Sequence, residues 1–331
     1  MNVGRVELHL HLDGSVYMPW AWKKAVERGV VKSDCTFEEY YDMMSFREDC
    51  TLEEVFKKFD FPIAIMQTRQ DLSESIYYLI KHLNDLGHIY AEIRYASQQH
   101  TLEGLTQEET IEALIDGMEK AKKDFPDVEV GLINCLMHKG ENALFNMEAN
   151  HEALEASKKY LGKGLVAVDL AGFENNGDFK LYAPLFEKAK ELGLPYTIHA
   201  GEMGMGEHVH DAIMMGTKRI GHGINCIQKE EWLQEVIDHD VTLEICLSSN
   251  CGTERNFASH PVRKLMAAGV KVTLNSDNMN FSKTNLVNEY NYMRSLGVSE
   301  EDLMKCTLNA VDAAFCSEET KEKLRKKLGV K

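Results

Sequence analysis

The chain has 331 residues, of which 44% are hydrophobic and 27% charged, and its formal net charge is -16. Such a chain can bury a sizeable core, and its acidic balance argues against binding nucleic acid or an anionic membrane through bulk electrostatics. No run approaches the roughly 20 apolar residues of a membrane span, no signal segment precedes the first predicted strand, and no C-x-x-C pair occurs among the eight cysteines. We therefore expect a cytoplasmic protein with reduced thiols and a small-molecule ligand, and no nucleic-acid or membrane partner. The oligomeric state is not indicated by the composition.

The first predicted element is a strand, VELHLHLD at residues 6–13, in which apolar and polar side chains alternate. Successive side chains of a strand point to opposite faces. One face would carry Leu8, Leu10 and Leu12, and the other Glu7, His9, His11 and Asp13. A solvent-exposed antiparallel strand would show the same alternation as a strand that carries metal ligands, so this pattern alone leaves both interpretations open.

Residues 16 to 88 follow, and their pattern is mostly helical. In TLEEVFKKFDF, residues 51–61, four apolar residues fall at relative positions 0, 3, 4 and 7, which share one face of a helix. These residues are Leu52, Val55, Phe56 and Phe59. Two interpretations stand side by side: ordinary core packing, or a helical insertion that serves as a hydrophobic lid over a substrate site.

Seven further short apolar strands are predicted, at residues 89–97, 128–136, 164–172, 194–201, 218–224, 241–249 and 271–277. Helical patterns separate the later ones, such as PLFEKAKELG (184–193), which ends on a glycine stop, and EEWLQEVIDH (230–239). Strands that alternate with helices pair in parallel, and eight such units predict an α/β fold, a closed (β/α)8 TIM-type barrel with extra helices inserted after the first strand. Because no linker interrupts residues 1–331, we expect a single domain with a helical lid insertion at about 16–88. An open doubly wound sheet is the alternative, although no G-x-G-x-x-G follows the first strand.

Residues of the kind that bind metals lie at the ends of four predicted strands. They are His9, His11 and Asp13 in the first strand, His199 in the fifth with Glu202 just after it, His222 in the sixth and Asp277 in the eighth. In barrels of this class the carboxyl ends of the strands form the active site. Three neutral imidazoles and one carboxylate suit Zn²⁺, and also other first-row divalent ions, with one position left for water. The pattern therefore predicts a metal hydrolase.

Three other histidines stay outside this predicted site. His208 and His210 form a second H-x-H, but they lie at the start of a predicted helix, where residues two apart diverge by about 200° and cannot readily chelate together. His138, after the third strand, has no evident partner, so we treat it as structural.

Eight motifs occur in a fixed order from residue 9 to residue 278: HLHLDGS, TLEEVFKKFD, YAEIRYA, VDLAG, HAGE, RIGHG, LEICLSSN and LNSDN. As an ordered set they resemble the adenosine deaminase family of the amidohydrolase superfamily. The resemblance implies a (β/α)8 barrel with one zinc ion per chain. It also implies an enzyme of purine metabolism, an adenosine deaminase, which hydrolyses adenosine to inosine and ammonia and accepts 2'-deoxyadenosine. Adenine, or another adenine-containing metabolite, is the alternative substrate.

Carried over residue by residue, the resemblance makes His9, His11, His199 and Asp277 the metal ligands. A metal-bound hydroxide would attack C6 of the purine, with Glu202 as the proton shuttle to N1 and with His222 and Asp277 holding the hydroxide. Asp13 would face the ribose hydroxyls, and Gly172 would offer its backbone to the purine. The implied substrate-binding residues are His11, Asp13, Gly172 and Asn278, together with Leu52, Val55, Phe56 and Phe59.

The chain departs from the family pattern at Asn278, where relatives usually have a second aspartate. That aspartate must be protonated to donate to N7 of the purine, whereas an amide donates at any pH, so we expect Asn278 to keep the contact. The alternative is that Asn278 caps the following helix. No lysine lies at the end of the fourth strand, VAVDLAG, which favours one metal ion over two.

Substrate choice depends on fewer residues. Asp13 favours a nucleoside, because relatives that act on free adenine tend to have a glutamate there. A nucleotide would need a cationic pocket, for which Lys57 and Lys58 are the candidates. Two rival classes are a related hydrolase of another amide or amino-substituted ring, and a zinc-containing binding protein without catalysis. The latter would be expected to have lost Glu202 or a ligand, and this chain keeps them all.

Overall fold

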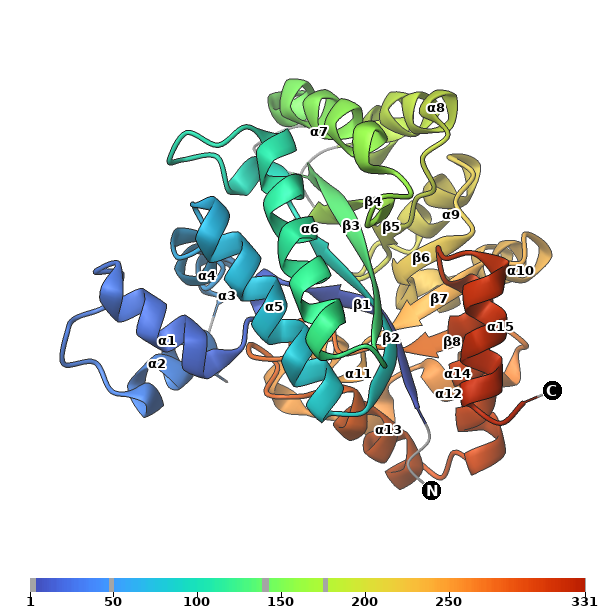
Figure 1. Ribbon diagram of the computed structural model, residues 1–331. Helices are drawn as coiled ribbons and strands as arrows, with labels where there is room; N and C mark the ends of the chain where they lie inside the picture. Colours follow the sequence, from blue (N-terminus) through green and yellow to red (C-terminus); the bar gives the residue numbers. More distant parts are fainter. Residues whose placement is uncertain (1–3, 48–50, 139–142, 175–177, 331) are drawn as a thin grey trace.

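The computed structural model describes residues 4–47, 51–138, 143–174 and 178–330. Within these residues, eight strands lie at the centre of the molecule and helices surround them (Figure 1). The strands are β1 (Arg5–His11), β2 (His88–Tyr95), β3 (Glu129–His138), β4 (Leu165–Gly172), β5 (Ile198–Ala200), β6 (Arg219–His222), β7 (Thr242–Ile245) and β8 (Lys271–Leu274). Strands β1 to β4 pair in parallel in this order, and so do strands β5 to β8.

Two parallel bridges close these two sheets into one barrel. Val168 of β4 pairs with Tyr196, just before β5, and Leu10 of β1 pairs with Asp277, just after β8. At the second bridge the Asp277 amide donates to the carbonyl of His9, and the His11 amide donates to the carbonyl of Asp277, both at 2.9 Å. The predicted (β/α)8 barrel is confirmed, and the open doubly wound sheet is wrong.

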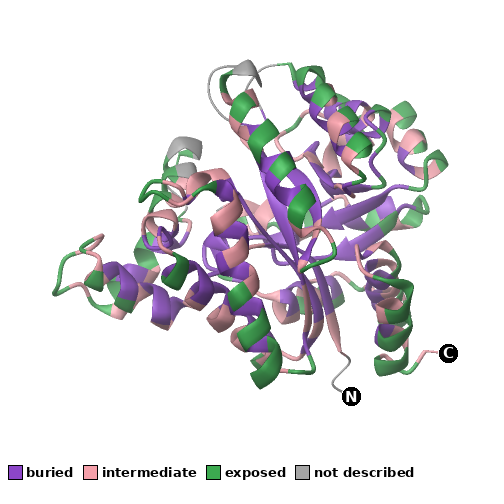
Figure 2. Ribbon diagram, turned by 45° about the horizontal axis from the view of Figure 1, so that its top comes forward, coloured by how far each residue is buried: buried purple, intermediate pink, exposed green. Residues whose placement is uncertain are grey.

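Strand β1 is buried on both faces, so the surface-strand interpretation of its alternation is wrong. Leu8 and Leu10 are 0% exposed, and Glu7 and His9 on the opposite face are also 0% exposed. Leu8 packs in a cluster with Val311 from the outer helices, because one face of a barrel strand lies beneath the helices and the other faces the interior. Figure 2 shows the same arrangement throughout: the strands are buried, and exposed residues gather on the outer faces of the helices.

The barrel helices lie outside the strands. They are α5 (Arg69–Asp85), α6 (Gln107–Asp124), α7 (Met147–Tyr160), α8 (Ala183–Leu192), α9 (Glu207–Met214), α10 (Glu230–Asp238), α11 (Leu247–Asn250), α12 (Val262–Ala267), α13 (Leu286–Ser295), α14 (Glu300–Ala313) and α15 (Glu318–Lys327). Gly193 ends α8 with a φ of 69°, so the predicted glycine stop is confirmed. Helix α10 matches the predicted helix at 230–239 to within one residue.

In the described part of the chain between β1 and α5, residues 48–50 set aside, there are four short helices: α1 (Met18–Glu27), α2 (Phe37–Met44), α3 (Leu52–Lys57) and α4 (Asp60–Ala64). Helices α1 and α2 extend away from the barrel, at the left of Figure 1. The single helix expected across residues 51–61 is wrong, because α3 ends at Lys57. The Lys58 amide there bonds to the carbonyl of Val55 in a tighter turn, and Pro62, which has no N–H to donate, lies in the first turn of α4.

Several predicted strands are shorter than expected, among them β6, which spans 219–222 instead of 218–224, and β8, which ends at Leu274 instead of residue 277. Strand β1 ends at His11, and Asp13–Ser15 forms a 3₁₀ turn in which Asp13 Oδ1 accepts from the Gly14 amide at 3.0 Å. Strand β5 spans only residues 198–200, and β7 ends at Ile245 before the helical turn of α11. The short polar side chains at these ends, an aspartate in one case and LSSN in another, favour turns because they bond to nearby backbone.

The cysteines of the described residues are unpaired, as predicted, and Cys50 lies outside those residues. None of the helices in the described ranges is long and apolar enough to cross a membrane.

Candidate metal centre and active site

The four predicted metal ligands come together at the carboxyl ends of the strands. The Nε2 atoms of His11 and His199 are 3.3 Å apart. Oδ1 of Asp277 lies 3.4 Å from Nε2 of His11 and 3.5 Å from Nε2 of His9. Four atoms placed tetrahedrally about 2.0–2.1 Å from a metal ion lie roughly 3.3 to 3.4 Å apart, so these separations fit one ion. Nε2 of His9 is buried and makes no hydrogen bond within the described residues, which leaves its lone pair free for such an ion.

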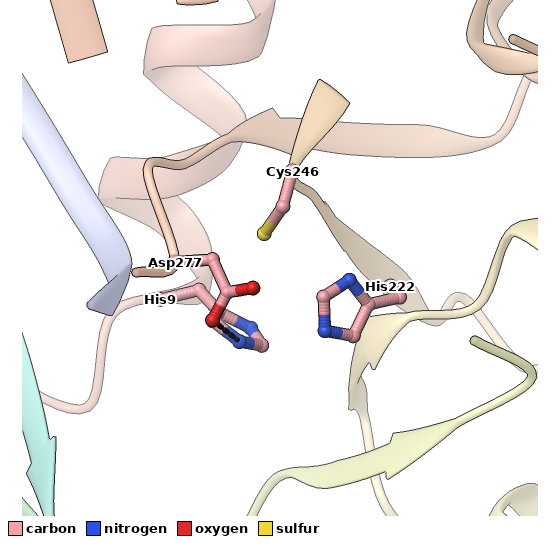
Figure 3. Close-up of side chains that lie close together, drawn as sticks. All are labelled: His9, His222, Cys246 and Asp277. Carbon is pink, nitrogen blue, oxygen red and sulfur yellow. Dashed lines mark ion pairs between the residues drawn. The ribbon is translucent and has the colours of Figure 1, made fainter. Parts of the chain in front are cut away.

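A second group of potential ligands in the described residues overlaps the predicted set and shares His9 and Asp277 with it. Figure 3 shows its members close together: His9, His222, Cys246 and Asp277. Cys246, just after β7, brings a thiol that the sequence patterns did not single out. Burial, and then the charge of Asp277, raise the pKa of this thiol well above its ordinary value. A protonated thiol is a poor metal ligand, so the predicted set remains the better candidate.

The backbone is strained where two of these side chains enter the site. His222 has a φ of 62° and Asp277 a φ of 58°, in the left-handed region that non-glycine residues rarely adopt. Gly221 lies between the rings: a Cβ there would be 3.0 Å from Cε1 of His9 and 3.2 Å from Cγ of His199. Gly221, the first glycine of RIGHG, thus lets the imidazoles of His9 and His199 pack against the backbone of β6.

Glu202 and Asp277 have opposite protonation states. Burial raises the pKa of Glu202 to about 8, and the charges of Asp277 and Glu174 add to this effect. Burial alone would also raise the pKa of Asp277, but the imidazole of His9 and two further histidines hold it well below its ordinary value. Oε1 of Glu202 lies 3.5 Å from Nε2 of His222. At neutral pH one carboxyl therefore carries a proton beside an ionised one, which is the pairing that acid–base chemistry needs.

Two residues predicted to contact the substrate lie after β1 and at the end of β4. Asp13 is 5% exposed, and burial raises its pKa to about 6. It lies in the 3₁₀ turn rather than on the face of β1, so its expected place in line with His9 and His11 is wrong. Gly172 ends β4 with a φ of 120°, and a Cβ there would lie 2.5 Å from the carbonyl oxygen of His138, so only glycine fits.

The predicted lid residues lie on and beside α3. Val55 and Phe59 are half-buried, whereas the side chains of Leu52 and Phe56 lie outside what the structure describes. The ring of Phe59 packs edge-on against Phe281, with ring centroids 4.6 Å apart. Phe281 belongs to the loop after β8 that also carries Asp277, so the insertion contacts a segment of the candidate site.

The histidines left out of the predicted site have other partners. Nδ1 of His208 lies 3.0 Å from Glu174, and Nδ1 of His210 lies 2.8 Å from Glu235. The two rings thus contact different carboxylates, as the helical spacing predicts. His138 is hydrogen-bonded through Nδ1 to the carbonyl oxygen of Phe173.

Known proteins resemble this chain along nearly its whole length. The family model described as adenosine deaminase matches residues 4–330. An adenosine deaminase of Clostridium perfringens strain 13 is 36% identical over 331 residues, which cover 98% of each chain. This chain belongs to the adenosine deaminase family. The predicted family, and the prediction of an enzyme, are confirmed.

Solved structures agree on the fold. An N6-mAMP deaminase of Arabidopsis has a TM-score of 0.86 and 25% identity, covering 99% of this chain and 98% of the other. An adenine deaminase of Arthrobacter aurescens has a TM-score of 0.86 and 23% identity, with the same coverage. The barrel is therefore shared among deaminases of different named substrates.

Buried carboxylates orient two of the candidate ligands in this member of the adenosine deaminase family. Nδ1 of His9 lies 2.8 Å from Oε2 of Glu244, and Nδ1 of His199 lies 2.9 Å from Oδ2 of Asp169. Arg94 donates to these same two oxygens, each at 2.8 Å. Burial opposes ionisation of Asp169, but His199 and Arg94 lower its pKa to about 2. A carboxylate that holds Nδ1–H, as Glu244 does at His9, leaves the Nε2 lone pair to face the metal, and Asp169 makes a close ionic contact at the same position of His199.

Glu174 is a further group that the sequence reasoning missed. It is 5% exposed, and its carboxylate accepts from the amides of Gly201, Glu202 and Met203, the last two at 2.9 and 2.8 Å. Nδ1 of His208 adds a fourth contact at 3.0 Å. Burial would raise the pKa of Glu174, but His208 and the backbone amides hold it below its ordinary value. An ionised carboxylate thus anchors the loop that carries Glu202.

The sequence contains a signal for the buried ion pairs behind the candidate ligands. Glu92 and Arg94 lie within the apolar strand IYAEIRYAS, and Glu244 lies within VTLEICLSS. Charged residues inside buried strands have to be paired, so these three could have been predicted to pair with one another or with the site. Glu174 has no comparable signal, because it lies outside any regular pattern.

Asn278 contacts Asp277 in this family member. Its Nδ2 donates to Oδ1 of Asp277 at 2.7 Å. Helix α13 is capped by Asn285, so the capping alternative for Asn278 is wrong. One of the two amide N–H groups remains for a ligand. The observed bond stabilises the charge of Asp277, a role that a second ionised aspartate could not perform.

Proposed function

We propose that this chain is a metal-dependent adenosine deaminase, which hydrolyses adenosine to inosine and ammonia and accepts 2'-deoxyadenosine. The observation that carries the proposal is the combination of closely spaced ligand atoms from His9, His11, His199 and Asp277 with a protonated Glu202 near them. A protein that only bound a metal would have no use for a carboxyl of raised pKa at this position.

The proposed ligands are His9, His11, His199 and Asp277, and their borderline donor set favours one zinc ion. Such an ion, when bound, supplies a coordinated water whose pKa is lowered towards about 7, and so a nucleophile at neutral pH. The buried carboxylates behind His9 and His199 support this assignment, because each would keep its imidazole turned towards the ion.

The proposed proton transfers follow from the two carboxyl groups. Glu202 holds a proton at neutral pH and would donate it to N1 of the purine as C6 is attacked, a contribution of roughly 10²- to 10⁴-fold in such reactions. Asp277 is ionised and would accept the proton of the attacking water. His222 would hydrogen-bond the water and hold it towards C6.

A nucleoside fits better than a nucleotide. Asp13 follows the proposed ligand His11 by two residues, in the turn after β1, and would bond the ribose hydroxyls. Lys58, one of two lysines considered for a phosphate, donates instead to the carbonyl oxygen of Met43 at 2.7 Å. We propose that residues 16–88 form a lid within a single domain, since Phe59 of this segment already packs on the loop that follows Asp277. The cytoplasmic location stays a prediction.

The test is ammonia release from the zinc-loaded protein with adenosine, 2'-deoxyadenosine, adenine, AMP and N6-methyl-AMP. We expect the first two to be the best substrates. Turnover of none of them would contradict the proposed function and favour the rival hydrolase of another ring. Glu202→Gln should keep its zinc and lose nearly all turnover, whereas the control Glu207→Gln, at an exposed position on α9, should remain active.

A further inference from the structure

His222 is linked through its second ring nitrogen to a chain of hydrogen bonds that leaves the active site. Its Nδ1 lies 2.9 Å from Nδ2 of Asn250, the last residue of α11. Oδ1 of Asn250 lies 3.2 Å from Nε2 of His260. The chain ends at the backbone N–H of Val262, which donates to Nδ1 of His260 at 3.1 Å.

The backbone N–H of Val262 fixes the donor and the acceptor of every hydrogen bond between it and His222. A backbone N–H can only donate, so Nδ1 of His260 accepts and the ring carries its proton on Nε2. Burial agrees, because it lowers the pKa of His260 to about 4 and keeps the ring neutral at pH 7. His260 then donates to Oδ1 of Asn250, which turns the amide N–H towards His222. If the side-chain amide of Asn250 were flipped, its N–H would face the Nε2–H of His260, and two donors would oppose each other.

We propose that Asn250 is a positioning residue that holds His222 with its proton on Nε2. Because Nδ1 of His222 accepts from Asn250, the neutral ring has its only N–H on the side that faces the site, 3.5 Å from Oε1 of Glu202. His222 therefore donates to the attacking water and cannot take up its proton. That proton passes to the carboxylate of Asp277. The assignment rests on the proposed function and narrows the role of His222 within it.

The first test is spectroscopic and needs no turnover. The zinc-loaded protein, with ¹⁵N-labelled histidine rings, is compared with His222→Gln to assign the His222 signals. We expect Nε2 to carry the proton and Nδ1 to be bare. A proton on Nδ1 in the wild-type protein would overturn the proposal, whether or not adenosine is deaminated. Absence of deamination with a proton on Nε2 would instead contradict only the proposed function.

Variants at position 250 supply the second test. Asn250→Asp can only accept, so it should move a proton to Nδ1 of His222. Asn250→Ala should leave a mixture of the two ring forms. We expect kcat of Asn250→Ala to fall on the order of 10- to 100-fold with KM and zinc content unchanged. Asn256→Ala, at an exposed position in the segment that follows α11, is the matched control and should match wild type. An Asn250→Ala variant with wild-type kcat and ring spectrum would contradict the proposal.

Discussion

Arg94→Met removes the cation that joins the two carboxylates behind the candidate metal ligands. Arg94 is 0% exposed, and it donates to Asp169, Glu244 and the carbonyl of Leu8 at 2.7 to 2.8 Å. Methionine would fill similar space but leave both carboxylates buried without their shared partner. Breaking a buried ion pair from one side costs about 3–5 kcal/mol, and we expect the free energy of unfolding of the metal-free protein to fall by that amount.

The same substitution should weaken metal binding. Glu244 bonds to Nδ1 of His9, and Asp169 contacts Nδ1 of His199, through the same oxygens that Arg94 contacts. When Arg94 is lost, burial favours protonation of these carboxylates, and the imidazoles lose their fixed orientation. Removing groups that orient ligands typically costs 10- to 100-fold in metal affinity, on the order of what we expect for Arg94→Met.

Arg219→Met is the matched control. Arg219 is 2% exposed and contacts Glu244 through the other oxygen, Oε1, at 2.7 Å, and Glu92 at 2.6 Å. Arg219→Met should destabilise the fold about as much as Arg94→Met does, but it should weaken metal binding less. The assays are urea unfolding of the metal-free protein and competition for zinc with a chromophoric chelator. Unchanged affinity in Arg94→Met, or an equal loss of affinity in both variants, would refute the reasoning.

Three further predictions concern single carboxyl or amide groups. Glu174→Gln weakens the anchor of the loop that carries Glu202, and steady-state kinetics should show kcat lowered on the order of 10- to 100-fold with zinc retained. Asn278→Asp should keep its zinc, but KM for adenosine should rise with pH, because an aspartate donates to N7 only while protonated, and a pH-independent KM would contradict this. Burial raises the pKa of Glu289 to about 7, so the folded state binds this proton more tightly than the unfolded state. Stability attributable to Glu289 should therefore fall as pH rises from about 4.5 to 7, by roughly 3 kcal/mol in total. Urea unfolding as a function of pH should show this loss in the wild-type protein and much less of it in Glu289→Gln, and an equal loss in both would contradict the assignment.

Pattern reasoning located each of the eight strands, because a buried parallel strand is a short apolar run between helical segments. The predicted ends of strands and helices were less accurate than their locations. The strand at 6–13 stops at His11, since Asp13 bonds to the backbone of its own turn, and the helix at 51–61 divides before Pro62. Local hydrogen bonds and the missing N–H of proline decided these boundaries, and neither shows in the spacing of apolar residues.

The sequence by itself determined the chemical groups of the candidate site. His9, His11, His199 and Asp277 lie at strand ends, and the closure of a parallel barrel brings strand ends together whatever the details of packing. Only the tertiary structure decided which buried groups orient these ligands and set their charge. His9 bonds to Glu244, 235 residues away. Such partners are chosen by register and depth inside the barrel, which no local pattern records, because the pairing energy of buried charges depends on three-dimensional distance and burial.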